Sequence, residues 1–439
     1  DRGYLTHPRL AGEGAADSEH LFFDLFPSLT QRDYLLAVFR ELSHLPGGED
    51  VLGPQHNPAW RLAPSTEVVR SLLAFFREAD SEGKLVWTFA GDGTRFLGDL
   101  YQDVSEAVRE RYALLQTPEF VEEFILDLTL DPAIAEFGLE QVRLLDPTCG
   151  SGHFLLGAFK RLFDARQRKG PGVPAKEHAA SALAQVYGAD INPYAAAIAR
   201  FRLVLAYLHA AEVDKLKNAP RVPTNVVVAD SLRFAANKQT LPFAAVAEDA
   251  TAWGEGSWQL EDPKDAQRVF AKKFHAVVGN PPYITCKDAK LREEYRAAYK
   301  SAAGKYALSA PFTERFFQLA TDGGFVGMIN ANSFMKREFG KALIERVLPT
   351  FELTRIMDTA GAYIPGHGTP TVLLFGRHRL AVADKLVAVL GKRGEPDVPS
   401  HPEKGRVWSS IRDHFAEPGF ENEYVSVAEI DRNTFNVHP

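Results

Sequence analysis

The stretch LLDPTCGSGHF, residues 144–154, places a glycine loop between an apolar run of strand character and the start of an apolar helix. Gly150 and Gly152 allow a tight backbone turn and close approach to a ligand, and the following helix begins with free N–H groups. The stretch lacks the Gly-Lys-Ser/Thr of a P-loop, which disfavours an NTPase. Asp146 repels phosphate and suits a ligand with an ammonium group. A turn with a purely structural role explains one such loop about as well.

Short β-rich runs alternate with helical patterns beyond about residue 117, which is typical of a doubly wound parallel sheet. Ligands bind such sheets outside the carboxyl ends of the strands, and four of the expected strands end in a polar or glycine-rich loop. We therefore predict an α/β fold with a doubly wound, seven-stranded Rossmann-like sheet. The strands are expected at residues 142–145, 185–189, 225–229, 274–279, 325–330, 353–357 and 371–375.

The sequence divides into three parts. Residues 1–116 carry apolar residues at helical spacing and no chemical motif, which predicts a helical N-terminal domain. Residues 117–380 carry the α/β pattern. Residues 381–439 are punctuated by glycine and proline, which predicts a linker with one short helix near residues 407–415. The chain starts at Asp1 without methionine or a targeting peptide, so we expect a piece of a longer protein.

The composition is that of an ordinary globular protein, because 45 % of the 439 residues are hydrophobic and 24 % are charged. No run of about 18 apolar residues is present, which excludes a membrane-spanning helix of that kind. Cys149 and Cys286 are too few for a disulfide framework or a cysteine zinc site, and they indicate a reducing, cytoplasmic location. We interpret both as packing residues.

The net charge of −7 hides an asymmetry. Residues 1–150 hold 12 Lys+Arg against 26 Asp+Glu, whereas residues 151–439 hold 38 against 31. The front of the chain is therefore acidic and the remainder is basic. A basic half is compatible with a polyanionic partner, although a solvated surface explains the same bias equally well.

Two further strands are each followed by an aspartate. In GADINP, residues 188–193, Asn192 and Pro193 start a helix and leave Asp190 free to accept hydrogen bonds from both hydroxyls of a ribose. Asp230 follows the strand at residues 225–229, where it could accept a hydrogen bond from an adenine amino group. The alternatives are a solvent-facing turn for Asp190 and a helix cap for Asp230.

The fourth motif is VVGNPPY, residues 277–283. Pro281 and Pro282 remove two backbone donors and fix φ, so the strand pairs no further and its carbonyls point outward. Asn280 adds a side-chain carbonyl, and Tyr283 adds a flat aromatic face. Two acceptors beside a stacking platform suit the conjugated amine of a planar base, whose lone pair they turn towards an electrophile.

In this order, the four motifs resemble those of S-adenosylmethionine-dependent DNA adenine-N6 methyltransferases of the gamma arrangement. The segment at residues 116–121 resembles the family segment that precedes the glycine loop, and residues 323–334 resemble a later strand and loop. Tyr363 stands where the family has an aromatic residue that stacks on the flipped base. The resemblance covers roughly residues 110–380 and implies a methyltransferase sheet.

The resemblance also implies roles for the residues of the site. Asp146, Gly150 and Thr117 face the methionine part of the cofactor S-adenosylmethionine. Asp190 faces its ribose, and Asp230 faces its adenine. No metal is expected. The implied catalytic residues are Asn280, Pro281, Pro282, Tyr283 and Tyr363, and the implied cofactor-binding residues are Thr117, Asp146, Thr148, Cys149, Gly150, Gly152, Asp190, Ile191, Asp230 and Ser231.

Within the family, residues 112–120, the helical front and residues 390–396 look like the methyltransferase of phage growth limitation and type 2 BREX phage-defence systems. This similarity implies that the chain marks host DNA, with double-stranded DNA and other phage-defence proteins as partners and no membrane. Members of that family are much longer and end in a target-recognition region, so we expect this chain to be the front portion.

Three alternatives remain at this point. A protein glutamine N-methyltransferase also uses Asn-Pro-Pro-Tyr, although such enzymes are shorter and lack both the segment at Thr117 and the large front. A module that binds cofactor without catalysis is the second alternative. A cytosine-C5 methyltransferase is disfavoured, because that chemistry needs a Pro-Cys nucleophile that neither cysteine supplies.

Overall fold

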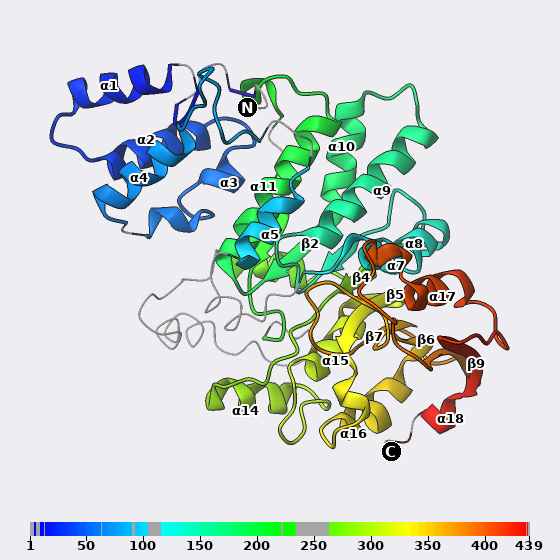
Figure 1. The fold of residues 1–439 in the computed structure, drawn as a ribbon. Coiled ribbons are helices and arrows are strands. Elements are labelled where there is room, and N and C mark those ends of the chain that lie inside the picture. The colour runs from blue at the N-terminus through cyan, green and yellow to red at the C-terminus, as the bar shows by residue number, and fades with distance from the viewer. Residues whose placement is uncertain are drawn as a thin grey trace.

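The computed structural model describes residues 4–5, 9–12, 14–62, 64–89, 93–103, 116–220, 223–233, 263–435 and 437. Nine strands within these residues form one sheet in the order β3-β2-β1-β4-β5-β7-β6-β8-β9 (Figure 1). The strands are β1 Leu144–Asp146, β2 Val186–Asp190, β3 Asn225–Val228, β4 Phe274–Gly279, β5 Ala320–Ala331, β6 Glu352–Asp358, β7 Thr371–Arg377, β8 Lys385–Gly391 and β9 Val425–Asp431.

Helices cover the sheet, and a group formed by α1 to α4 lies beside α11 (Figure 1). No helix among the described residues is long and apolar enough to cross a lipid bilayer. The helices are α1 Ala15–Leu25, α2 Gln31–Ser43, α3 Glu49–Leu52, α4 Thr66–Phe76, α5 Arg95–Asp103, α7 Glu119–Asp127, α8 Leu130–Phe137, α9 His153–Lys169, α10 Ala175–Ala184, α11 Pro193–Ala210, α13 Pro263–Phe270, α14 Ala289–Ala298, α15 Ser309–Leu319, α16 Gly340–Ala342, α17 Arg406–His414 and α18 Arg432–Phe435.

The strand order reverses between β1 and β4. Strand β1 pairs in parallel with β2 on one side and with β4 on the other, and β3 and β5 extend the parallel part. In doubly wound sheets this reversal opens a crevice at the carboxyl ends of the strands. Asp146 is the last residue of β1, and Gly279 is the last residue of β4, so the two motifs meet at this position.

The sheet separates two hydrophobic cores because successive side chains of a strand point to opposite faces. In β1, Leu144 packs into the core that includes residues of α7, α9, α10 and α11, whereas Leu145 packs into the core that includes residues of α13, α14 and α15. Both leucines are fully buried. This double burial explains why the parallel strands appear in the sequence as continuous apolar runs.

The seven predicted strands are confirmed, with ends shifted by a few residues, but the sheet formed by the described residues has nine strands and not seven. Strands β8 and β9 continue the sheet beyond β6, so the prediction of a linker over residues 381–439 is wrong. Leu386 and Ala388 of β8, and Val425 and Val427 of β9, are buried. Glycine and proline residues near these strands made the apolar pattern of the strands hard to recognise in the sequence. The helix expected near residues 407–415 forms as α17.

The N-terminal helices have a small core of their own, formed by Tyr34 and Val38 of α2 with Val69 and Leu73 of α4. Helix α2 begins with a capping box in which Thr30 accepts a hydrogen bond from the Asp33 N–H and donates its own N–H to the Asp33 carboxylate. Helices α1 to α5 therefore occupy part of residues 1–116, while Ala79 and Leu85 pair in an isolated antiparallel β-bridge. Residues 104–115, which belong to the same predicted helical pattern, lie outside the described part.

Candidate active site

Asp146 ends β1 where the strand order reverses, and only 1 % of the residue is exposed. Its Oδ1 accepts hydrogen bonds from the N–H and the hydroxyl of Thr148, at 2.9 and 3.2 Å. Burial raises the pKa of the Asp146 carboxyl to about 8, although the Thr148 bonds oppose the shift. Since a nearby cation stabilises such a buried carboxylate, Asp146 can bind the positively charged part of a ligand.

The two glycines of the loop have different surroundings. Gly150 has a φ of 52°, and a Cβ atom there would meet no atom within 4 Å, so the backbone faces open space. Gly152 has a φ of 89°, and its Cβ would lie 3.0 Å from the Cβ of Ala199 in α11. Gly150 therefore leaves room for a ligand, whereas Gly152 allows close packing of two helices.

Cys149 anchors this loop to the neighbouring strand. Its N–H donates to the carbonyl of Ala189 at 2.9 Å, and the side chain is 5 % exposed. A Cβ on Gly188 would lie 3.1 Å from the Cys149 sulfur, so the thiol fills the space above that glycine. Burial also raises the pKa of the thiol well above its usual value. These contacts describe a packing residue with an unreactive thiol.

Asp190 is less free than the sequence indicated. Its Oδ2 accepts a hydrogen bond from the N–H of Gly150 at 2.9 Å, and its Oδ1 accepts one from the N–H of Asn192 at 2.8 Å. Each carboxylate oxygen retains a lone pair for a ligand hydroxyl. Burial raises the pKa of Asp190 to about 6. The carboxylate thus shapes the glycine loop as well as offering acceptors, and the next side chain, Ile191, is 38 % exposed.

Asp230 and Ser231 make contacts that hold the loops together. The Asp230 carboxylate accepts hydrogen bonds from the N–H of Leu232 at 3.0 Å and from the hydroxyl of Tyr295 at 2.6 Å. Burial raises its pKa. Ser231 donates through Oγ to the carbonyl of Pro147 at 2.6 Å, which links the loop after β3 to the loop after β1. The sequence did not indicate the contacts with Tyr295 and Pro147, since these partners are distant in the chain.

The Asn-Pro-Pro-Tyr motif lies directly beside the glycine loop. A Cβ on Gly279, the residue before Asn280, would lie 2.6 Å from Oδ1 of Asp146 and 2.9 Å from Oγ1 of Thr148. The structure thus brings together two motifs that are more than a hundred residues apart in the sequence. Pro281 is buried, and Pro282 is half-buried.

The hydroxyl of Tyr283 is buried and has no hydrogen-bond partner among the described residues. Burial raises the pKa of this phenol far above its usual value. The ring of His367 lies 6.1 Å from that of Tyr283, tilted by 50°. Tyr363, the aromatic residue that the sequence predicts here, is 37 % exposed and precedes His367 by four residues in the chain.

His367 is a residue that the sequence analysis missed. Both of its ring nitrogens are buried without a hydrogen-bond partner among the described residues. Burial lowers the pKa of the imidazole to about 4, although an interaction with the backbone of Gln116 opposes the shift, so the ring is neutral near pH 7. Its position in a glycine-rich turn after Tyr363 was the available signal, and that signal did not distinguish it from a loop histidine.

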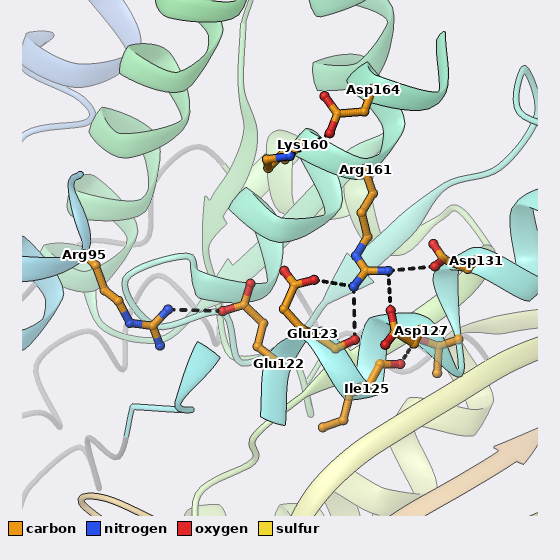
Figure 2. Close-up of polar contacts among 10 residues, drawn as sticks. Arg95, Glu122, Glu123, Ile125, Asp127, Asp131, Lys160, Arg161 and Asp164 are labelled. Atoms are coloured by element: carbon orange, nitrogen blue, oxygen red, sulfur yellow. Dashed lines mark hydrogen bonds and ion pairs between the residues drawn. The ribbon is translucent and has the colours of Figure 1, made fainter. Parts of the chain in front are cut away.

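Thr117 lies just before α7 and is 4 % exposed. Figure 2 shows how α7 is held against α9, the helix that follows the glycine loop. Arg161 of α9 forms ion pairs of 2.7 Å with Asp127 and with Asp131, and it also pairs with Glu123. One guanidinium thus fixes three carboxylates at the start of α8 and along α7, and with them the segment that carries Thr117.

These residues form a continuous site at the carboxyl ends of β1, β2 and β4. The geometry joins Asp146, Thr148, Gly150 and Asp190 to the Asn-Pro-Pro-Tyr motif. A ligand with an ammonium group and neighbouring hydroxyls fits this set, because a cation stabilises the ionised form of the buried Asp146 carboxyl and Gly150 leaves space above the loop. The amino acid and ribose of S-adenosylmethionine have these groups.

Known proteins share this arrangement in sequence as well. The Eco57I restriction-modification methylase family matches residues 184–364, a range that contains Asp190, Asp230 and the Asn-Pro-Pro-Tyr motif. The adenine-specific methyltransferase PglX of Streptomyces coelicolor is 44 % identical over 98 % of this chain. This chain is a homologue of the adenine-specific methyltransferases. The resemblance noted in the sequence is therefore confirmed, and the glutamine methyltransferase alternative is not favoured.

Other proteins similar to this chain are more distant. The type II methyltransferase M.XhoI of Xanthomonas vasicola is 29 % identical over 57 % of the chain. The chain spans 38 % of the length of PglX and 39 % of that of M.XhoI. The methyltransferase subunit of a type I restriction-modification system from Streptococcus thermophilus has a similar fold, with a TM-score of 0.50 at 14 % identity over 99 % of this chain and 80 % of that one. The DrdV–DNA complex aligns with a TM-score of 0.53 at 16 % identity, covering 93 % of this chain and 39 % of that one.

Proposed function

We propose that this chain binds S-adenosylmethionine at the carboxyl ends of β1, β2 and β3 and transfers the methyl group to N6 of an adenine in DNA. Residues 117–380 would carry the catalytic machinery, with residues 1–116 as a helical domain beside it. We further propose that the mark labels host DNA within a phage-defence system that contains other proteins.

The observation that carries the proposal is the contact between the two motifs. A Cβ atom on Gly279 would lie only 2.6 Å from Oδ1 of Asp146, so the two chain segments touch at this point. Asn280 is the next residue after Gly279 and therefore lies close to the start of the glycine loop. A methyl donor held by that loop and an amine held by Asn280 would therefore be neighbours. Proximity of this kind supplies much of the rate in a transfer reaction that needs no strong base.

Several residues of the chain would hold the cofactor. S-adenosylmethionine, the methyl donor of this family, supplies an activated methyl group when it is bound. Asp146 would bind the ammonium group of its methionine part, with Thr117, Thr148 and the Gly150 backbone beside it. Asp190 would accept hydrogen bonds from the ribose hydroxyls with its remaining lone pairs. Ile191 would lie against the ribose and adenine, and the loop of Asp230 and Ser231 would border the adenine.

The acceptor amine would be held from the other side. The side-chain carbonyl of Asn280 and the backbone carbonyl of Pro281 would accept its two hydrogens and aim its lone pair at the methyl group. Tyr283 and Tyr363 would stack on the base, with Pro282 fixing the turn between them and Asn280. The neutral His367 ring, 6.1 Å from Tyr283, would offer a donor and an acceptor to the edge of the base.

Duplex DNA would be the substrate because the family that matches residues 184–364 is a family of restriction-modification methylases. The target adenine must leave the helical stack to reach a methyl group in a buried site. The similarity to PglX over 98 % of this chain supports the role in phage defence and the proposal that further proteins of such a system take part.

Transfer of tritiated methyl groups from S-adenosylmethionine tests the function on two acceptors, host genomic DNA and a glutamine-containing protein substrate. The longer protein that contains this chain is the enzyme to assay, with Asn280→Ala as its inactive counterpart. We expect label in DNA, recovered as N6-methyladenine after digestion. Label in protein but not in DNA would favour the glutamine methyltransferase instead.

A further inference from the structure

Helix α5 of the N-terminal part reaches the proposed cofactor site. We propose that α5, through Arg95 and Gly98, forms a wall at the methionine end of that site and positions Thr117 and Ser151 for the cofactor. This inference rests on the proposed function, since it names further residues of the same site. It assigns a cofactor-positioning role to a region in which the sequence shows no chemical motif.

Arg95 holds the segment that carries Thr117. Its Nη2 donates a hydrogen bond to the carbonyl of Thr117 at 2.7 Å. Its Nη1 lies 3.6 Å from the carboxylate of Glu122 (Figure 2). The same atom lies 3.9 Å from the carboxylate of Glu119, and both glutamates are in the first turn of α7. The guanidinium therefore fixes the backbone of Thr117 and the start of the helix that follows.

Glu122 connects this contact to the helix that follows the glycine loop. Glu122 is 4 % exposed. Its Oε1 packs so closely against Gly157 of α9 that a Cβ atom on that glycine would overlap it. Arg95 is too distant for a hydrogen bond to Glu122, so it offsets only part of the cost of burial, and the pKa of Glu122 is raised to about 8. The Glu122 carboxyl of α7 therefore packs directly against the backbone of α9.

Gly98 brings the backbone of α5 against both sides of the site. A Cβ on Gly98 would lie 2.6 Å from the hydroxyl oxygen of Ser151 in the glycine loop and 2.8 Å from Nε2 of Gln116. A residue with any side chain at this position must displace one of these groups. Gly98 itself is buried, as expected for a backbone packed this closely against both groups.

A second arginine completes the wall. Arg202 of α11 donates through Nη1 to the carbonyl of Ser151 at 2.7 Å and through Nε to the hydroxyl of Thr94 at 3.2 Å, just before α5. Arg202 and Arg95 also contribute to the lowered pKa of His153, whose buried position is the larger cause. Two positive charges therefore stand beside the glycine loop, opposite in sign to the carboxylate of a methionine moiety, while Asp146 is opposite in sign to its ammonium group.

This arrangement predicts an effect confined to one end of the cofactor. S-adenosylhomocysteine contains the complete amino acid moiety, whereas methylthioadenosine retains the sulfur and the nucleoside but lacks that moiety. The variants to test are Arg95→Ala and Gly98→Leu. Arg70→Ala is the matched control, since Arg70 is exposed on α4 of the same N-terminal part.

Calorimetric titration of each protein with both ligands gives the readout. We expect Arg95→Ala to weaken S-adenosylhomocysteine binding by at least about tenfold, because one hydrogen bond from a charged group is lost. Gly98→Leu should weaken it as well, because the new side chain must displace Ser151 or Gln116. Methylthioadenosine binding should change less than about twofold in both variants. Arg70→Ala should bind both as the wild type does. Retained methylthioadenosine binding shows in the same experiment that each variant is folded.

Three results would overturn the inference. Unchanged S-adenosylhomocysteine affinity in both variants would show that α5 does not position the methionine end. An equal loss for both ligands would show that α5 supports the site as a whole and not this end. A wild-type chain that binds neither ligand would instead overturn the cofactor site itself, and with it the proposed function.

Discussion

Gly279 packs against the carboxylate of Asp146 so closely that a Cβ atom on the glycine would lie 2.6 Å from Oδ1 of the aspartate. Each residue ends a parallel strand, and the two strands are neighbours at the reversal of the strand order. This contact places the proposed binding sites of the methyl donor and of the acceptor amine directly beside each other. The absence of a side chain at residue 279 is therefore a requirement of the site as well as of the fold.

We expect Gly279→Ala to weaken cofactor binding, because the new methyl group must displace Asp146 or Thr148, which lies 2.9 Å away. Overpacking of this kind costs about 1–3 kcal/mol of unfolding free energy, which thermal denaturation measures. Gly172→Ala is the control, since a Cβ there meets no atom within 4 Å. Equal effects of the two substitutions on S-adenosylhomocysteine affinity would contradict the contact.

Asn280→Ala should abolish methylation and leave cofactor affinity near that of the wild type. The reason is that the Asn280 carbonyl is assigned to the acceptor amine and to no part of the cofactor. Methyl transfer to DNA and calorimetric titration with S-adenosylhomocysteine measure the two effects separately. The exposed Asn218→Ala serves as control. A variant that methylates adenine at the wild-type rate would place the acceptor site elsewhere.

Much of the fold could be predicted from the sequence, since buried parallel strands appear as apolar runs between helical patterns. All seven strands expected from these runs form. Strands β8 and β9 were missed because glycine and proline occur near them in the sequence, and because β9 is an edge strand that exposes alternate residues. The buried residues of β9 share a core with α17, whose Trp408 lies 5.4 Å from the ring of Phe124 in α7. A contact over that sequence separation leaves no local pattern.

Proton-linked binding gives a further prediction at Asp146. Its pKa of about 8 means that most of the free protein carries this proton below pH 8, whereas an ammonium ligand requires the ionised form. Affinity for S-adenosylhomocysteine should therefore rise from pH 6 to pH 7.5, by up to about tenfold per pH unit. Methylthioadenosine, which lacks the ammonium group, should show little change. A flat profile for both ligands would exclude Asp146 as the ammonium partner.

The positions of the site residues could be predicted from motifs, but their existing contacts could not. Asp190 already accepts the Gly150 N–H, and Asp230 already accepts the Tyr295 hydroxyl. Arg95 and His367 belong to no motif, and they reach the site through folding of distant segments. A short motif records the residues that contact a ligand, whereas residues that support them can occur wherever the fold brings a segment near.

Glu122 predicts a pH dependence of stability. In the folded chain the pKa of Glu122 is raised to about 8, so the proton is retained up to about that pH, while the unfolded chain releases it near the ordinary glutamate pKa of 4.5. Between these values the folded state binds more protons, so this group stabilises fully below pH 4.5 and its contribution is lost as pH rises towards 8. The wild-type free energy of unfolding should fall by up to about 1.4 kcal/mol per pH unit from this source.

Glu122→Gln removes this titration while keeping a neutral side chain between α7 and α9. Urea denaturation at pH 5.5 and pH 8.5 should give a smaller difference for Glu122→Gln than for the wild type. Asp146 and Asp190 also have raised pKa values, so both proteins keep part of the fall, and the comparison isolates Glu122. The exposed Glu177→Gln should behave as the wild type does. Equal pH differences in all three proteins would mean that Glu122 is ionised in the folded chain, paired with Arg95 despite their 3.6 Å separation.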